Sequence, residues 1–594
     1  MGRRCSCSCQ RLPVEADQPL ASSTTHGFSI RFVLKKTMSS WPVPSALDAG
    51  TQIFPDLTTA QIDRIRPGSK LRRVEPGEIL FRPGDTGVPF FVFLSGSMEI
   101  VQPDVTGERL VTTHHRAGAF TGELSMISGQ RCLVLGRVTE LGDLLELSPE
   151  ALRSLIARDA ELSEIIMRAF ILRRLALITN HLGNVILMGS RHSAATLRLC
   201  EFLGRNGHPY TYVDLDTDKM SQELLDRFAV NLADVPIVIC DARTVLRNPS
   251  IQQLAECLGL NVSVDSTQVR DLIIVGAGPA GLGAAVYAAS EGLDVLLAET
   301  EAPGGQAGSS SKIENYLGFP TGVSGQELAS RAISQAQKFG AKMMVAHSVV
   351  KLNCDRRPYK LVLDDGSTLS SRAIVIATGA RYNKPPIADL KKFEGQGVYY
   401  GATYIESQLC GDEDVIVVGG GNSAGQAAVF LSQTARKVYM LVRSGGLAET
   451  MSRYLIQRIS ENPAIELHFN TELESLNGYA QLERVGWIDK STRQTSSHEI
   501  RHVFIMAGAS PRTDWLRGCV AMDDKGFILT GRDLDGTSES PVWPLARAPQ
   551  MLETSLPGVF AVGDVRSGNV KRVASAVGEG AISVHLVHRA LAEV

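Results

Sequence analysis

The stretch that decides the fold reads Leu272-Ile273-Ile274-Val275-Gly276-Ala277-Gly278-Pro279-Ala280-Gly281. Four apolar residues run into a glycine-rich turn, and a helix is expected to follow over 282–290. Gly276 permits the tight turn, and Gly278 lets the backbone approach a pyrophosphate. Gly281 lets the helix pack against the strand, so that the helix N-terminus points at the phosphates. The pattern predicts a dinucleotide site built on Gly276, Gly278, Pro279, Ala280 and Gly281.

The residues after this turn complete the same signature. A second apolar strand, 295–298, ends in Glu299, close to the offset of roughly 20 residues at which a carboxylate holds ribose hydroxyls. A glycine motif alone is a weak signal. The strand, turn, helix and acid together are specific for a nucleotide-binding α/β unit.

A second motif, Val415-Ile416-Val417-Val418-Gly419-Gly420-Gly421-Asn422-Ser423-Ala424, repeats this design with Ala424 in place of the third glycine. The strand that follows, 438–442, ends in Arg443 rather than in an acid. A carboxylate there would repel a ribose 2′-phosphate, whereas an arginine binds it, so we expect NADPH rather than NADH. The alternative is an ordinary surface arginine. The expected site residues are Gly419, Gly421, Asn422, Ser423, Ala424 and Arg443.

Chain length, net charge and cysteine spacing limit the remaining possibilities. A chain of 594 residues exceeds one hydrophobic core, so we expect roughly three to five domains. The formal net charge of −3 favours neither nucleic acid nor an anionic membrane. No uncharged apolar run approaches the roughly 20 residues of a membrane span. The ten cysteines are scattered without a C-x-x-C pair, which argues against a secreted disulfide scaffold and favours a cytoplasmic protein.

The N-terminal residues 1–48 are predicted to be a disordered tail. No apolar stretch follows Arg3 and Arg4, as a signal peptide would require. Cys5, Cys7 and Cys9 have the spacing of a soft-metal ligand set, but no histidine or second cluster lies nearby. We therefore assign no metal site.

Residues 268–594 resemble the low-molecular-weight thioredoxin reductases. The resemblance rests on motifs in the order typical of that family: Pro303-Gly304-Gly305-Gln306, Ile313-Glu314-Asn315-Tyr316, Ile376-Ala377-Thr378-Gly379-Ala380, Val559-Phe560-Ala561-Val562-Gly563-Asp564 and Arg572-Val573-Ala574. It implies a homodimer and an FAD domain into which an NADPH domain is inserted. It also implies further FAD-binding residues, namely Gly305, Gln306, Asn315, Thr378, Gly379, Asp564, Arg572, Val573 and Ala574. Asp564 would hold the ribityl and phosphate region, and the helix that opens at Arg572 would direct its positive end at the flavin.

One departure from this family concerns its chemistry. Thioredoxin reductases carry a Cys-Ala-Thr-Cys redox pair just before the second glycine motif, where this chain reads Gly401-Ala402-Thr403-Tyr404. Neither Gly401 nor Tyr404 can form a disulfide, so electron transfer from flavin to a disulfide is impossible at this place. Catalytic residues are therefore unassigned. Tyr404 is expected near the flavin ring, and Cys410 is interpreted as a packing residue rather than a thiol relay.

Two further resemblances concern the N-terminal half. Residues 183–263 are similar to a glutaredoxin-like or thioredoxin-like domain, with Val235-Pro236 at its cis-proline site and Ser190-Arg191-His192-Ser193 where an active-site C-x-x-C would stand. Short strands between turn glycines over 54–138 predict a β-roll that resembles cyclic-nucleotide-binding domains. That resemblance implies a phosphate cassette of Gly122, Glu123, Leu124 and Arg131. The hydrophobic Cys132-Leu133-Val134 replaces the family's small or hydroxylated residues, so a nucleotide ligand and a degenerate contact module both stay open.

These patterns predict a multidomain protein. We expect an N-terminal β-roll, a small thioredoxin-like α/β domain and two Rossmann-like α/β domains, one inserted in the other. The expected boundaries are a tail at 1–48, the roll with its helices at 49–182, the thioredoxin-like domain at 183–263, the first part of the FAD domain at 268–385, the NADPH domain at 386–505 and the second part of the FAD domain at 506–594.

Three functions fit this architecture. The first is an NADPH-dependent FAD oxidoreductase whose acceptor is a ferredoxin-like protein, a quinone, oxygen or a partner disulfide. The second is a redox-responsive or cyclic-nucleotide-responsive signalling protein with an eroded reductase half. The third is disulfide reduction that uses external thiols. The absence of a basic helix-turn-helix module argues against a transcription factor.

Overall fold

The computed structural model describes residues 53–593, apart from gaps at 105–106, 115–116, 123–124, 180–184, 191–192, 217–233, 241–243, 262–264, 266, 403, 480 and 536–542. The expected disordered tail and its three cysteines lie outside the described residues.

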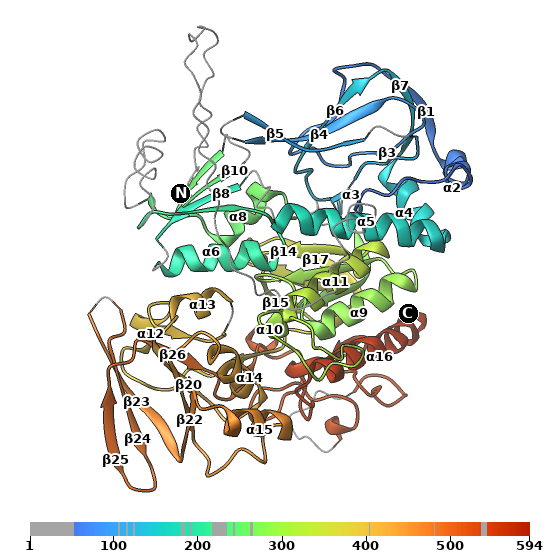
Figure 1. The fold of residues 1–594 in the computed structure, drawn as a ribbon. Helices are drawn as coiled ribbons and strands as arrows, with labels where there is room; N and C mark the ends of the chain where they lie inside the picture. Colours follow the sequence, from blue (N-terminus) through green and yellow to red (C-terminus); the bar gives the residue numbers. More distant parts are fainter. Residues whose placement is uncertain are drawn as a thin grey trace, which may run out of the picture.

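A β-roll forms the N-terminal part of the described chain (Figure 1). Two antiparallel sheets have the strand orders β1-β7-β3 and β2-β6-β4-β5. The strands are β1 (Lys70–Val74), β2 (Ile79–Phe81), β3 (Phe90–Phe93), β4 (Ser97–Asp104), β5 (Gly107–His114), β6 (Leu135–Glu140) and β7 (Gly142–Leu147). Every residue of β3 is buried. The rings of Phe90 and Phe170 pack edge to face with their centroids 6.1 Å apart, so the roll shares its core with the helix that carries Phe170.

The helices of this part pack against the strands of the roll, and the longest of them lies between the roll and the rest of the molecule (Figure 1). They are α2 (Thr59–Ile65), η1 (Arg66–Gly68), α3 (Ser125–Ser128), α4 (Pro149–Arg158) and α5 (Ala160–Thr179). The Ser148 hydroxyl accepts a hydrogen bond from the Ala151 N–H at 3.2 Å, and Pro149 takes the first helical position. Both features favour a helix start, so α4 begins where the sequence supplies a cap.

A small α/β unit follows the roll. Its sheet has the order β11-β10-β8-β9, in which β8 and β9 are parallel while β10 is antiparallel to both of its neighbours. The elements are β8 (Val185–Gly189), α6 (Ala194–Arg205), β9 (Thr211–Asp214), β10 (Ile237–Cys240), β11 (Thr244–Arg247) and α8 (Ile251–Leu258). The Val235–Pro236 peptide bond is cis.

The first glycine motif lies in a larger sheet with the order β14-β13-β12-β17-β16-β15, and β28 also pairs with β17. Strands β14, β13, β12, β17 and β28 are parallel, while β15 and β16 form an antiparallel extension. All of β13 is buried, as expected for a parallel strand covered on both faces. The strands are β12 (Val269–Val275), β13 (Val295–Glu299), β14 (Lys342–Val345), β15 (Val349–Asn353), β16 (Tyr359–Leu363), β17 (Thr368–Ile376) and β28 (Val559–Ala561). The helices are α9 (Pro279–Ser290), α10 (Gly305–Gly308), α11 (Gly325–Lys338), η3 (Asp514–Leu516), η4 (Gly531–Leu534), η5 (Gly563–Val565) and α16 (Val573–Ala592).

The second glycine motif lies in a separate unit reached through a two-stranded ribbon. Strands β18 (Ala380–Tyr382) and β27 (Ala509–Pro511) pair antiparallel, so the chain leaves the first unit and returns to it side by side. Between them lie a parallel sheet ordered β19-β26-β20-β21-β22 and an antiparallel sheet ordered β23-β24-β25. The strands are β19 (Val398–Tyr399), β20 (Asp414–Val418), β21 (Lys437–Val442), β22 (Ile465–Phe469), β23 (Thr471–Asn477), β24 (Arg484–Asp489), β25 (Gln494–His498) and β26 (His502–Ile505). The helices are α12 (Leu390–Phe393), α13 (Tyr404–Leu409), α14 (Asn422–Leu431) and α15 (Arg453–Glu461).

Two disulfides join cysteines that are distant in sequence, Cys240 with Cys257 and Cys354 with Cys519. The scattered cysteine spacing predicts no disulfide framework, yet the fold pairs four cysteines. Their sequence separations are 17 and 165 residues, so packing rather than local spacing brings each pair together.

Candidate functional site

Two glycines of the first motif, at the junction of β12 and α9, have no room for a side chain. Gly276 has a φ of +101°, and a Cβ there would lie 2.4 Å from the carbonyl oxygen of Ala377. A Cβ at Gly281 would lie 1.9 Å from the carbonyl oxygen of Gly276. The helix can therefore approach the strand end only because both positions are glycine.

An open cradle lies at the start of α9. A Cβ built on Gly278 would have one neighbour within 4 Å, the Cα of Gly305 at 3.8 Å. Gly304 and Gly305 both have positive φ, and the Gly304 N–H donates to the Ala277 carbonyl at 2.8 Å, which ties this loop to the turn. The N-terminus of a 12-residue helix thus faces a space walled by backbone, which fits a pyrophosphate.

Glu299 ends β13 beside this cradle. One carboxylate oxygen accepts the Ala277 N–H at 2.7 Å, and the other accepts the Glu301 N–H at 3.1 Å. Burial raises the pKa of the Glu299 carboxyl, while these two hydrogen bonds act in the opposite direction. Each oxygen keeps acceptor capacity, so the group fits ribose hydroxyls.

Asp564 lies after β28, opposite the start of α16. Burial raises the pKa of its carboxyl. Lys571 donates to the backbone carbonyl of Asp564 at 3.4 Å, and among the described residues no group donates to the carboxylate. An unpaired, partly buried carboxylate fits a hydroxyl-bearing ligand. Arg572 stands at the N-cap of the 20-residue α16, which begins with Val573 and Ala574.

The remaining residues predicted for this site lie in α10 and in the loops that follow α10 and β17. Gln306 donates to the Ala380 carbonyl at 2.5 Å, and Thr378 donates to the Arg512 carbonyl at 3.0 Å. Gly379 adopts a φ of +64° between β17 and β18. Asn315 is exposed on the loop between α10 and α11.

The second turn repeats the geometry of the first. Gly419 has a φ of +141°, and a Cβ there would lie 2.6 Å from the Met506 carbonyl oxygen and 3.1 Å from the Cβ of Ala424. Gly421 is the N-cap of α14, whose first residues are Asn422 and Ser423. This turn therefore also directs a helix N-terminus at an open space.

Arg443 directly follows β21, where the first unit has its acid. It is exposed, and it makes no hydrogen bond or ion pair with any described residue. A free guanidinium at this position can bind a phosphate on a ribose.

The two turns are linked through Tyr382 of the ribbon. The Tyr382 hydroxyl interacts with Ser423 of the second turn, and its phenol lies close enough to Asp564 for that carboxylate to act on its pKa. Burial is the main cause of the raised pKa of Tyr382. An ion pair between Arg458 on α15 and Glu314 also joins the two units. The start of α14 thus neighbours the Asp564 end of the first site.

The place of the missing redox pair holds no sulfur. Gly401 precedes α13, which begins at Tyr404; the Tyr404 side chain, expected near a flavin ring, lies outside what the structure describes. Cys410 is buried, and its thiol donates to the Glu406 carbonyl at 3.2 Å. Burial raises the pKa of Cys410 to about 12, so it is a neutral thiol at physiological pH.

The cassette of the roll is only partly described, because Glu123 and Leu124 lie outside the described residues. Arg131 donates to the Cys257 carbonyl at 3.0 Å, at the end of α8 in the small α/β unit. Arg173 of α5, which sequence reasoning missed, is buried and donates to the Gly122 carbonyl at 2.9 Å. Burial lowers the pKa of Arg173 to about 9. No local motif signals Arg173, because its partner lies 51 residues away.

The small α/β unit shows ordinary polar contacts where a C-x-x-C would stand. Ser190 donates to Asp216 at 2.7 Å, and Ser193 caps α6 by accepting from the Thr196 N–H. Arg191 and His192 lie outside the described residues. Within the described ranges, no set of three or more metal-ligating side chains comes together, and no helix is both long and apolar enough to cross a membrane.

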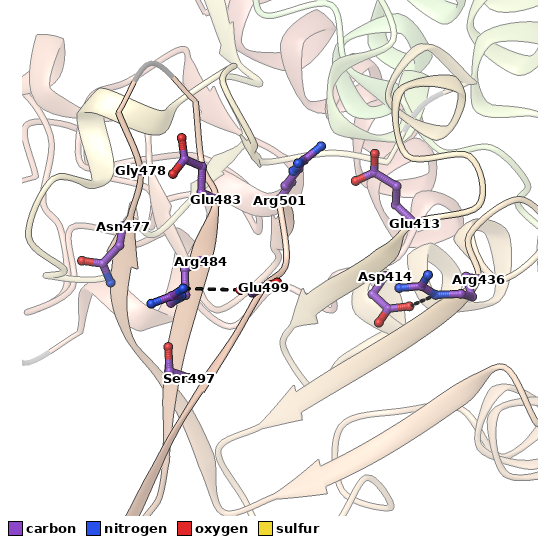
Figure 2. Close-up of a pocket in the computed structure, with 10 residues that line it drawn as sticks. All are labelled: Glu413, Asp414, Arg436, Asn477, Gly478, Glu483, Arg484, Ser497, Glu499 and Arg501. Carbon is purple, nitrogen blue, oxygen red and sulfur yellow. Dashed lines mark hydrogen bonds and ion pairs between the residues drawn. The ribbon is translucent and has the colours of Figure 1, made fainter.

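A hollow of about 800 Å³ lies in the second unit, and Figure 2 shows the residues that line it. It is lined by Glu413, Asp414, Arg436, Asn477, Gly478, Glu483, Arg484, Ser497, Glu499 and Arg501. Asp414 pairs with Arg436 at 2.7 Å, and Arg484 pairs with Glu499 at 3.4 Å, so much of the charge is neutralised. The hollow lies at the start of β20, whereas the Gly419 turn follows its end. It is therefore separate from the nucleotide cradle.

Two family models match the chain. One, described as pyridine nucleotide-disulphide oxidoreductase, matches residues 270–580, and the other, described as cyclic nucleotide-binding domain, matches residues 71–159. The thioredoxin reductase of Mycoplasmopsis pulmonis is 31% identical over 322 residues, which cover 54% of this chain and 97% of that protein. The thioredoxin reductase of Bacillus subtilis is 31% identical over 330 residues, which cover 55% of this chain and 96% of that protein. The crystal structure of Lactococcus lactis thioredoxin reductase (FR conformation) is 26% identical with a TM-score of 0.49, covering 55% of this chain and 100% of that one.

The first cradle can be tested by filling it. Gly278→Ala adds a methyl group that the protein accommodates, since its nearest neighbour would lie 3.8 Å away, but that occupies the space facing the helix N-terminus. We expect an unchanged thermal unfolding midpoint for the nucleotide-free protein and a loss of dinucleotide binding of about tenfold or more. Gly276→Ala is the contrasting variant, because its clash with Ala377 should lower the unfolding midpoint itself. Full dinucleotide binding by Gly278→Ala would contradict this assignment.

Proposed function

Because this chain belongs to the pyridine nucleotide-disulphide oxidoreductase family, and so is a flavin oxidoreductase that uses a nicotinamide cofactor, we propose that it uses FAD and NADPH and sends the electrons to an acceptor outside the chain. The observation that carries this proposal is the pairing of two intact glycine turns with a sulfur-free segment at Gly401 and Tyr404. The proposed acceptors are a ferredoxin-like protein, a quinone or a partner disulfide.

Bound FAD supplies the hydride-accepting and electron-donating chemistry, so the side chains need only bind, orient and exclude water. In this proposal the N-terminus of α9 binds the pyrophosphate. Glu299 accepts the ribose hydroxyls, and Asp564 accepts hydroxyls of the ribityl chain. The N-terminus of α16 directs positive potential at the flavin, which favours an anionic reduced form.

The nicotinamide cofactor is proposed to bind at the Gly419 turn with Arg443 on its 2′-phosphate. The contact of Tyr382 with Ser423 and its closeness to Asp564 support this division of roles, because they put the second turn next to the Asp564 end of the first site. We further propose a cytoplasmic homodimer and a thioredoxin-like fold for the small α/β unit. Its strand order β11-β10-β8-β9 supports that fold.

For the roll we propose a contact module. The arginine that would hold a cyclic phosphate, Arg131, already donates to the Cys257 carbonyl. The next positions, Leu133 and Val134, are buried and apolar, so they offer a phosphate no hydroxyl donors. The other reading, a cyclic-nucleotide-responsive signalling protein, requires Arg131 to leave this contact.

The nicotinamide assignment predicts a charge-dependent preference. In anaerobic stopped-flow mixing, NADPH should bleach the absorbance of the bound flavin much faster than NADH at equal concentration. Arg443→Ser should slow the NADPH reaction by about tenfold or more and leave the NADH reaction nearly unchanged, because only the 2′-phosphate contact is lost. Equal losses with both cofactors would contradict the role of Arg443. A yellow protein that neither cofactor bleaches would favour the signalling reading.

The roll proposal makes a separate prediction. Isothermal titration of the full chain with cAMP or cGMP should give no binding heat. Arg131→Ala should lower the thermal unfolding midpoint, because the hydrogen bond to Cys257 is lost. Binding of either nucleotide by the unaltered protein, abolished in Arg131→Ala, would overturn the contact-module proposal.

A further inference from the structure

The small α/β unit packs against the first Rossmann-like unit at the edge where a nucleotide would lie. Val345, the last residue of β14, and Ala346 belong to the same buried cluster as Val185, Leu187 and Leu199 of the small unit. Asn261 accepts the Val345 N–H at 2.8 Å. Since β14 pairs with β13, this interface lies beside the strand that ends in Glu299.

Arg205 extends this contact to the cradle itself. It is the last residue of α6, and its side chain is 16% exposed. One terminal nitrogen donates to the carbonyl of Ala302 at 3.0 Å and to that of Gly305 at 3.1 Å. The other terminal nitrogen pairs with Glu201 at 3.3 Å. The buried Nε–H has no acceptor among the described residues.

The loop held by Arg205 is the wall of the dinucleotide site. Gly305 packs directly against Gly278, since a Cβ at Gly305 would lie 2.9 Å from the Gly278 Cα, and the loop begins just after Glu299. The positive charge of Arg205 also acts on Glu299, where it opposes the burial that raises the pKa of that carboxyl. The guanidinium therefore fixes the wall of the cradle and favours the ionised form of the carboxylate beside it.

We propose that Arg205 is a positioning residue for FAD, supplied by a unit outside the region that matches the oxidoreductase family. The family match covers 270–580, and α6 ends 65 residues before it. This proposal rests on FAD occupying the first cradle. It gives the small unit, whose turn carries Ser190 and Ser193 where a C-x-x-C would stand, a role in holding the adenosine end of the flavin cofactor.

The charged groups facing Glu299 define the expected pH dependence. Arg205 from α6 lowers the pKa of Glu299, and Glu301 on its own loop raises it. From the segment after β14, the His347 N–H donates to the Glu299 backbone carbonyl, while the imidazole faces Asp364 and Asp365. Removing the charge of Arg205 should raise the pKa of Glu299 further. The protonated carboxyl is the weaker acceptor, so FAD affinity should then begin to fall at a higher pH.

The test measures FAD affinity in the full chain after the flavin has been removed and added back, from mildly acidic to mildly alkaline pH. Arg205→Met should weaken FAD binding by about tenfold or more and move the acid-side loss of affinity to higher pH. Arg205→Lys should keep the pH profile of the unaltered protein and recover part of the affinity, because it retains the charge but not the planar fork. Gln326→Ala is the matched control, since Gln326 donates to the Gly204 carbonyl at the same interface without approaching Glu299.

The outcomes separate the two proposals. If the unaltered protein takes up no FAD, the proposed function fails. If it binds FAD and Arg205→Met matches it at every pH, the role of Arg205 fails. A loss that is equal at every pH and is shared by Gln326→Ala also overturns that role, because it would reflect only a loosened interface. Should Arg205→Met fail to fold, Arg205→Lys alone decides, and a displaced pH profile in that variant would count against the proposal.

Discussion

Neither Gly276 nor Gly281 has room for a side chain where β12 turns into α9, and the nucleotide-binding half of the protein depends on that constraint. A Cβ at Gly281 would lie 1.9 Å from the Gly276 carbonyl oxygen, so helix and strand end meet backbone to backbone. This contact directs the first N–H groups of α9 at the space beside the Gly305 backbone, which packs against Gly278. Glu299 ends β13 and Asp564 follows β28, two strands of the same sheet that are separated by β12 and β17.

Two features of the chain bear on its reaction: both glycine turns are present, and the cysteine pair of thioredoxin reductases is absent. The family to which it belongs is described as a disulphide oxidoreductase family, yet Gly401 and Tyr404 carry no sulfur and Cys410 is a buried thiol. The small α/β unit likewise has serines at both ends of its turn. Because the cysteine pair is absent at both positions while the two nucleotide turns are present, the activity that we propose is transfer from flavin to an outside acceptor. Arg131 and Arg205 show how the remaining modules contribute contacts to each other and to the cradle.

Local patterns in the sequence were sufficient for some features and not for others. The strand, turn and helix at 272–290 are contiguous, so the apolar run and the glycines predict them directly. The resemblance to thioredoxin reductases is confirmed by the first family match together with the relatives at 31% identity, and the resemblance to cyclic-nucleotide-binding domains is confirmed by the second family match. The partner of Arg131 lies 126 residues away, and Arg205 reaches a carbonyl 97 residues away. The Cys354–Cys519 pair spans 165 residues. Such contacts depend on how separately folded units pack, which periodicity and spacing do not encode.

The central claim is that no disulfide of this chain receives electrons from the flavin. The stoichiometry of anaerobic reduction tests this claim most directly. Titration of the full chain with NADPH, followed through the flavin absorbance, should reach complete bleaching at a single equivalent per bound FAD, with no new thiols after denaturation. Uptake of a second equivalent, accompanied by two new thiols per chain, would show that a disulfide receives the electrons and would contradict the account.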